Sequence, residues 1–126
     1  MRAFYTEAAM LLPRVTERMG AKEKYLHIVG YSYGGGVGQV LARLAQAEGF
    51  NVAVTTFGAP RVGDKAWAAA KNYRHTRYAH SNDPFVRVPP WLQHDVAPTP
   101  VGGEHGRWTA HFSYFMKEAF PLDQAR

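Results

Sequence analysis

The stretch from Tyr25 to Ala42 constrains the fold of this chain more than any other part of the sequence. It opens with a short apolar run, passes through Gly-Tyr-Ser-Tyr-Gly at residues 30–34, and continues with apolar residues at helical spacing. This pattern predicts a buried strand, a sharp turn and a helix. A serine at the apex of such a turn is typical of a nucleophile elbow, where we expect side chains at Gly30 and Gly34 to clash. Taken alone, the pentapeptide also fits a glycine-rich turn with an incidental serine.

The composition predicts one folded domain over residues 1–126. The chain is 46% hydrophobic and 13% aromatic, which argues against disorder. It contains no cysteine, so it has no disulfide, thiol nucleophile or cysteine-ligated metal. The apolar run Ala8–Leu12 is too short for a signal-peptide core or a membrane span. No feature of the sequence assigns a compartment.

The formal net charge is +5, which favours anionic partners such as a phospholipid interface. The basic residues are scattered along the chain rather than clustered, so most of them are expected on the solvated surface. There is no basic stripe with interleaved aromatic residues, and nucleic-acid binding is therefore not expected.

Apolar periodicity and turn residues divide the chain into alternating helices and strands. The predicted strands are Tyr25–Val29, Val52–Phe57 and Tyr73–His80, and the predicted helices are Phe4–Met19, Gly34–Ala47, Lys65–Lys71 and Trp108–Phe120. Pro13 should kink or restart the first helix, and Asp64 is a plausible N-cap for the third. Prolines predict an extended segment over Val86–Pro90, and Trp91–Arg107 has the composition of a loop.

This order of elements predicts an α/β fold, a mostly parallel sheet flanked by helices with right-handed crossovers. Ligands of such sheets bind at the carboxyl ends of the strands. Ser32 follows the first predicted strand and Asp83 follows the third, so both should lie in the same crevice. Three strands are few for this architecture, and both sheet edges would need cover.

A serine hydroxyl becomes a good nucleophile only when a base removes its proton, and a carboxylate must orient that base. The order along the chain in α/β-hydrolases is Ser, then Asp or Glu, then His. Ser32, Asp83 and His111 follow this order. Asp64 and Asp95 compete with Asp83, which is preferred because it lies just past a predicted strand end, although it also suits a turn before proline.

The remaining histidines fall into two groups. His94 and His105 lie in the long loop and compete with His111 for the role of base. His27 is interpreted as structural, and His75 and His80 lie too near Asp83 in the sequence to be the best base. The histidines show no tight metal-ligand spacing with carboxylates, so neither a metal site nor a cofactor is predicted.

Four stretches together resemble the class 3, fungal-type triacylglycerol lipases. They are Val29-Gly-Tyr-Ser-Tyr-Gly-Gly35, Thr56-Phe-Gly-Ala-Pro-Arg-Val-Gly-Asp64, Asn82-Asp-Pro-Phe-Val-Arg-Val-Pro-Pro90 and His111-Phe-Ser-Tyr-Phe115. The resemblance implies an α/β-hydrolase fold with Ser32 as nucleophile, Asp83 as acid and His111 as base. It also places His94 near the serine but outside the triad, and makes 58–61 a structural loop beside the site.

The sequence departs from the family because the early strands, the mobile lid and the loop that gives one oxyanion-hole donor have no counterpart in it. Only the backbone N–H of Tyr33 can be assigned as a donor. We therefore expect a partial α/β-hydrolase fold, the C-terminal portion of the family domain, with exposed apolar surface and a tendency to self-associate.

The function expected from the resemblance is hydrolysis of lipid (acylglycerol) esters at a lipid–water interface. The alternative is a catalytically weak or inactive lipase-like module that binds lipid surfaces or a partner chain.

Overall fold

A parallel four-stranded sheet forms the centre of the structure, a computed structural model that describes residues 2–20 and 22–115. The strands are β1 (Tyr25–Tyr31), β2 (Asn51–Phe57), β3 (Arg74–Ala79) and β4 (Thr99–Pro100), and they lie in this order in the sheet. Each pairs in parallel with the next. The predicted fold class, a mostly parallel sheet flanked by helices, is confirmed.

Strand β4 lies inside the predicted loop, so the prediction of three strands was wrong. It consists of two exposed residues that pair with Tyr78 and Ala79 of β3. Two residues show no alternation of apolar and polar side chains, and one of them is a proline, which is unusual in strands. The local sequence therefore contains no signal for this strand.

The helices are α1 (Arg2–Met19), α2 (Ser32–Ala47), α3 (Lys65–Ala69) and α4 (Arg107–Phe112). Asp64 caps α3 as predicted, because its carboxylate accepts the backbone N–H of Trp67 at 2.8 Å. Helix α1 continues through Pro13, so the predicted restart does not occur. Proline removes a single helical hydrogen bond, and both halves of the helix pack on the core with α2, Ala8 and Leu12 before Pro13 and Met19 after it.

Two predicted segments differ in detail. Phe85–Arg87 forms a 3₁₀ turn where an extended segment was predicted, and extended backbone begins at Val88. The backbone N–H of Phe85 donates to the Asp83 carboxylate, which favours the turn. Helix α4 ends at Phe112 and a 3₁₀ turn, Ser113–Phe115, follows it. The rest of the predicted helix, 116–120, lies outside the described residues.

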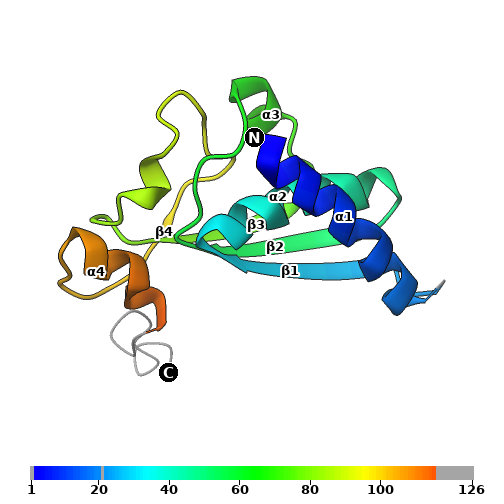
Figure 1. The fold of residues 1–126 in the computed structure, drawn as a ribbon, viewed down its shortest axis with the longest axis horizontal. Helices are drawn as coiled ribbons and strands as arrows, with labels where there is room; N and C mark the ends of the chain where they lie inside the picture. Colours follow the sequence, from blue (N-terminus) through cyan, green and yellow to red (C-terminus); the bar gives the residue numbers. More distant parts are fainter. Residues whose placement is uncertain (1, 21, 116–126) are drawn as a thin grey trace.

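Helices α1 and α2 lie on the same face of the sheet (Figure 1). The main core fills the space between them and the strands. Its members from the strands alternate with outward-facing residues, as period-two patterning requires. Its most buried apolar residues are Ala8, Leu12, Val37, Val40, Leu41, Ala42, Ala45, Val52, Val54, Val62 and Tyr73.

No helix of the described chain lies over the opposite face of the sheet along most of β1 (Figure 1). Tyr25 and Val29 face that side and are 49% and 64% exposed. Only at the carboxyl end does a smaller cluster form, where Tyr114 packs with Tyr31 and Phe57. Strand β1 is also an edge strand, with one side unpaired among the described strands.

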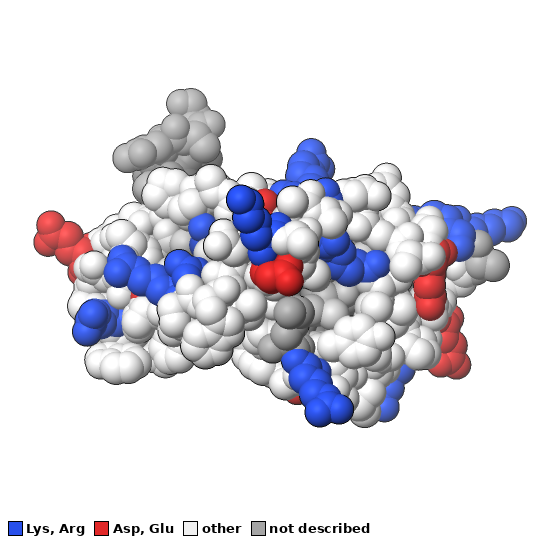
Figure 2. All heavy atoms as spheres, turned by 90° about the horizontal axis from the view of Figure 1, so that it is seen from above, with Lys and Arg blue, Asp and Glu red and all other residues white. Residues whose placement is uncertain are grey.

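Charged side chains are dispersed over the surface rather than gathered. Figure 2 shows Lys and Arg separated by uncharged surface and by acidic residues, without one continuous basic patch on the face seen there. None of the helices within 2–20 and 22–115 has the length and apolar composition needed to cross a bilayer.

We predict that the isolated chain self-associates, because the side chains of Tyr25 and Val29 and an edge strand are exposed. Light scattering should give a mass above the 14.1 kDa of one chain. Val29→Lys should lower that mass, since a charge on an exposed edge strand opposes pairing. The matched control is Thr16→Lys, which adds the same charge on α1, away from the edge strand. A parent that is monomeric at micromolar concentration would contradict the prediction.

Candidate active site

The backbone turns sharply between β1 and α2, and Ser32 occupies the turn. Its φ of +51° makes it the one non-glycine residue of the described chain with positive φ, a conformation that costs free energy in most residues. An ideal Cβ on Gly30 would lie 2.6 Å from the carbonyl oxygen of Gly34. The strand and the helix therefore approach closely enough that only glycine fits at position 30.

The expectation for Gly34 was wrong. A Cβ at Gly34 would meet nothing within 4 Å. The tight position on the helix is Gly35, where a Cβ would lie 2.7 Å from the Cβ of Ala59. Gly34 lies on the outer side of the first turn, whereas Gly35 faces the loop after β2.

The structure brings Ser32, Asp83 and His111 into one hydrogen-bonded line. The Oγ of Ser32 lies 2.8 Å from Nε2 of His111. The Nδ1 of His111 lies 2.9 and 3.0 Å from the two carboxylate oxygens of Asp83. The carboxylate can only accept, so Nδ1 donates to it and Nε2 is left to accept the hydroxyl proton of Ser32.

Asp83 is fully buried, and its carboxylate accepts hydrogen bonds from Tyr114 and Phe85 as well as from His111. The Tyr114 hydroxyl donates to Oδ2 at 2.8 Å and the Phe85 backbone N–H donates to Oδ1 at 2.9 Å. Burial, with the Asp83 carboxylate as a further cause, raises the pKa of Tyr114, so its hydroxyl stays protonated and remains a donor. Gly58, with φ of +60°, leaves the space that these groups occupy.

The side chain of His111 is 6% exposed, and aromatic neighbours hold its imidazole. The Phe85 ring centroid lies 4.1 Å from that of the imidazole. The Tyr31 ring lies 5.2 Å away, and its hydroxyl donates to the His111 carbonyl oxygen at 2.7 Å. Tyr31 ends β1, next to Ser32 in the chain, so this bond fixes α4 against the turn that holds the serine.

The two competing carboxylates have other partners. Asp64 caps α3. Asp95 accepts from Nδ1 of His75 at 2.7 Å and from the Tyr73 hydroxyl at 3.2 Å. Burial acts to raise the pKa of Asp95, but the hydrogen bond and charge of His75 outweigh it and the pKa is lowered. Asp95 is thus ionised near neutral pH and is bound away from His111.

The other histidines do not contact Ser32 in the described structure. Nε2 of His94 donates to the Val86 carbonyl oxygen at 2.6 Å, and its Nδ1 is buried without a partner. Burial lowers the pKa of His94 to about 4, so the ring is neutral at pH 7. His80 lies 2.9 Å from the Gly103 carbonyl oxygen and contacts the ring of His105. His27 contacts Thr55 on the open face of the sheet.

A cavity of about 540 Å³ opens beside Ser32. Its walls are mostly apolar, which suits an acyl chain more than a polar ligand. They are formed by Phe4, Tyr33, Pro60, Phe85, Val88, Pro89, Pro90 and Trp91. The proline-rich segment after the 3₁₀ turn therefore makes one side of this cavity.

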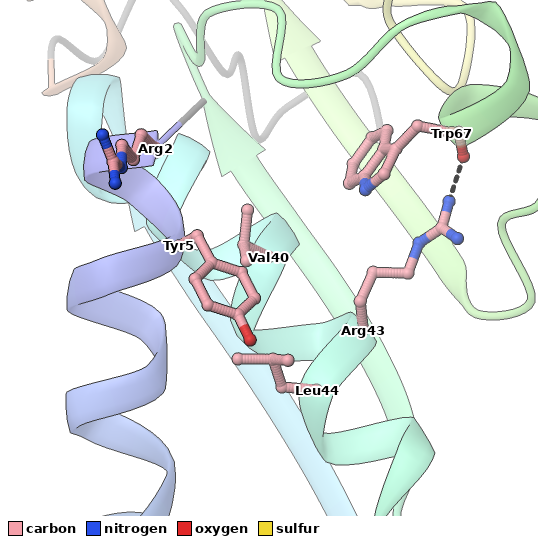
Figure 3. A pocket seen from close by; sticks show the side chains of 6 residues that line it. All are labelled: Arg2, Tyr5, Val40, Arg43, Leu44 and Trp67. Atoms are coloured by element: carbon pink, nitrogen blue, oxygen red, sulfur yellow. Dashed lines mark hydrogen bonds between the residues drawn. The ribbon is translucent and has the colours of Figure 1, made fainter.

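A second cavity, of about 450 Å³, lies between α1, α2 and α3 (Figure 3). It is lined by Tyr5, Val40, Leu44 and Trp67 and by two arginines, Arg2 and Arg43. The guanidinium of Arg43 donates to the carbonyl oxygens of Trp67 and Ala70 and stacks on the Trp67 ring. These bonds tie α2 to α3. The cavity contains no hydroxyl–imidazole pair, so it is not a candidate active site.

No group of three or more His, Asp or Glu side chains within 2–20 and 22–115 is arranged to hold a metal ion.

Comparison with known proteins identifies the class. Residues 2–93 match the family described as Lipase (class 3), so the chain belongs to the class 3 lipase family. The resemblance stated from the sequence motifs is thus confirmed at the level of the family.

Two kinds of relatives illustrate the match. A secreted mono- and diacylglycerol lipase of Fusarium solani is 31% identical over 94 residues, which is 71% of this chain and 28% of that protein. The Lip2 lipase of Yarrowia lipolytica shares the fold, with a TM-score of 0.60 and 21% identity over 75% of this chain and 38% of that one. The nonglycosylated form of the same lipase gives 0.59. The chain thus spans well under half the length of these relatives.

We predict that Gly30→Ala lowers the free energy of unfolding by about 1–3 kcal/mol, because the new methyl group overlaps the backbone of α2. Gly34→Ala is the matched control. It should be neutral or stabilise by up to about 1 kcal/mol, since it adds a helix-favouring residue in open space. Urea denaturation measures both, and equal effects of the two substitutions would contradict the geometry.

Proposed function

We propose that this chain forms the serine-hydrolase site of a lipase and cleaves carboxylic esters of lipids. The observation that supports the proposal is the line of hydrogen bonds from Ser32 through His111 to buried Asp83, at a turn where the serine backbone is strained. Nucleophile, base and orienting carboxylate in hydrogen-bond contact are the signature of acyl transfer by serine. We further propose that residues 1–126 act as one domain unit of the family fold.

In the proposed mechanism His111 removes the hydroxyl proton of Ser32 through Nε2 while Oγ attacks the ester carbonyl carbon. The imidazolium that forms is stabilised by Asp83 at Nδ1. It then protonates the departing alcohol, and an acyl group remains on Ser32. Water, deprotonated by His111, releases the carboxylic acid and restores the serine.

The tetrahedral intermediate has a negative oxygen that needs hydrogen-bond donors. Tyr33 is the second residue of α2, and the first N–H groups of a helix have no intrahelical acceptor. We propose its backbone N–H as one oxyanion donor. A second donor is not assigned within the described residues, and lack of one such donor typically costs about 10²–10³ in kcat. The rate of the isolated chain should therefore be low, and esters with good leaving groups should be its best substrates.

The site walls and the relatives support the proposed substrate class. The cavity beside Ser32 is mostly apolar, and the Fusarium relative is named a mono- and diacylglycerol lipase. Trp91, Trp108 and Phe112 are 77%, 67% and 61% exposed. The ring of Trp108 contacts that of Phe85, and the ring of Phe112 contacts the imidazole of His111. Aromatic side chains exposed around an ester site suit contact with a lipid–water interface.

We predict that Ser32→Ala abolishes hydrolysis of p-nitrophenyl butyrate while the circular dichroism spectrum stays unchanged. A fluorophosphonate probe should label the parent at Ser32, identified by peptide mass spectrometry, and should not label the variant. Ser81→Ala is the control, because no hydrogen bond within the described residues joins the Ser81 hydroxyl to His111 or Asp83. Undiminished turnover in Ser32→Ala would show that another group attacks the ester.

A separate prediction distinguishes His111 from His94. His111→Ala should reduce kcat/KM by about 10³-fold or more, to the level of Ser32→Ala, because nucleophile and base act as a unit. His94→Ala should cost about tenfold or less, since it removes one hydrogen bond to the Val86 carbonyl oxygen. The reverse ranking would assign the base to His94. Steady-state kinetics on p-nitrophenyl butyrate measures both.

A further inference from the structure

A second hydroxyl–imidazole–carboxylate line lies inside the molecule, apart from the site described above. Nε2 of His75 lies 2.8 Å from the Thr56 hydroxyl, and its Nδ1 lies 2.7 Å from the Asp95 carboxylate. Thr56 is fully buried, and the side chains of His75 and Asp95 have no exposed surface. A substrate cannot reach the Thr56 hydroxyl, so this line has no direct role in attack on an ester.

One end of this line lies under the turn that holds the nucleophile. Thr56 pairs with Gly30 in the parallel register of β1 and β2. A Cβ placed on Gly35 would lie 3.4 Å from the Cβ of Thr56, so the threonine side chain packs beneath the first turn of α2. The interior of the sheet at this point therefore supports the backbone around Ser32.

The other end holds the segment that forms a wall of the cavity beside Ser32. Asp95 lies four residues after Trp91, and Val88, Pro89, Pro90 and Trp91 line that cavity. The loop after β2 holds one part of this segment, because Arg61 donates to the carbonyl oxygens of Val88 and Pro90 and the Gln93 N–H donates to the Gly63 carbonyl. Strand β3 holds its end through His75–Asp95 and through Arg77, which donates to the Val96 carbonyl at 3.1 Å.

Polar groups buried to this extent must be paired to be tolerated, and a paired network fixes the distance between the elements that it joins. The shape of an acyl pocket is in turn decided by the position of its walls. A pocket distinguishes chains that differ by a methylene by about 1–3 kcal/mol, so a displaced wall changes which chains fit.

We propose that Thr56, His75 and Asp95 are positioning residues that fix the 88–91 wall relative to Ser32 and thereby set the acyl-chain preference of the site. The inference rests on the proposed function for the acyl chain, whereas the position of the wall is a property of the fold alone. The two parts can therefore be tested separately.

The first measurement concerns the wall and needs no activity. The chain is produced with 5-fluorotryptophan, and Trp67, Trp91 and Trp108 are assigned by Trp→Phe substitution in ¹⁹F NMR. In Asp95→Ala, the Trp91 signal should move from its parent position because the segment that carries this exposed ring is displaced, while the Trp67 signal on α3 stays in place. Asp95→Asn should restore the parent spectrum, because its amide oxygen still accepts from His75. An unchanged Trp91 signal in a folded Asp95→Ala chain would overturn the proposal.

The second measurement concerns the preference. The ratio of kcat/KM for p-nitrophenyl octanoate to that for p-nitrophenyl acetate should fall about tenfold in Asp95→Ala, mainly through KM for the octanoate. It should stay within about twofold of the parent value in Asp95→Asn. Leu26→Ala, at the far end of β1 from Ser32, is the control for lost stability. A ratio of two substrates does not depend on the folded fraction, so instability alone leaves it unchanged.

If Asp95→Ala does not fold, a more conservative substitution at Thr56 tests the same proposal. Thr56→Val keeps the shape of the side chain and removes the hydroxyl, and Thr56→Ser is its matched control. The octanoate-to-acetate ratio should fall in the first and be kept in the second. A constant ratio in every variant overturns the proposed role in preference. A parent that hydrolyses neither ester overturns the proposed function instead, and the Trp91 signal then decides whether the buried line holds the wall.

Discussion

The close approach of β1 and α2 at Gly30 is the contact on which the rest of the site depends. A Cβ at this position would lie 2.6 Å from the backbone of α2. Because glycine has no Cβ, the helix can begin directly at the strand end, with Ser32 held at positive φ. The serine hydroxyl then faces the carboxyl edge of the sheet, where the turn after β3 places Asp83 and where α4 presents His111. Any side chain at position 30 would separate the two elements and displace the hydroxyl from the imidazole.

The parts of the fold that could be predicted are those with a signal in contiguous sequence. Apolar periodicity found the three longer strands and the four helices, and turn residues found their connections. Asp64 was recognisable as a cap because capping acts over three residues. The proximity of Ser32 and Asp83 also followed from topology, since the carboxyl ends of parallel strands meet at one edge.

The parts that could not be predicted depend on contacts between residues far apart in the chain. Strand β4 exists because β3 offers an unpaired edge, and its two residues have no pattern of their own. The tight glycine on the helix is position 35 rather than 34, which is decided by where Ala59 packs. From the sequence, His75 was interpreted as a residue of the third strand and Asp95 as a competitor of Asp83. In the structure the two side chains form a hydrogen bond with each other. Likewise, Pro13 is tolerated because α1 is held by its buried face.

The two hydroxyl–imidazole–carboxylate lines show that residue types alone do not define a nucleophile. Ser32–His111–Asp83 and Thr56–His75–Asp95 have the same order of groups and similar distances, 2.8 and 2.9 Å against 2.8 and 2.7 Å. They differ in the backbone conformation and the exposure of the residue that carries the hydroxyl. Ser32 lies on a strained turn at the mouth of a cavity, and Thr56 lies within a strand, fully buried. The turn makes the first hydroxyl accessible to an ester carbonyl, and the strand makes the second a structural hydrogen-bond partner.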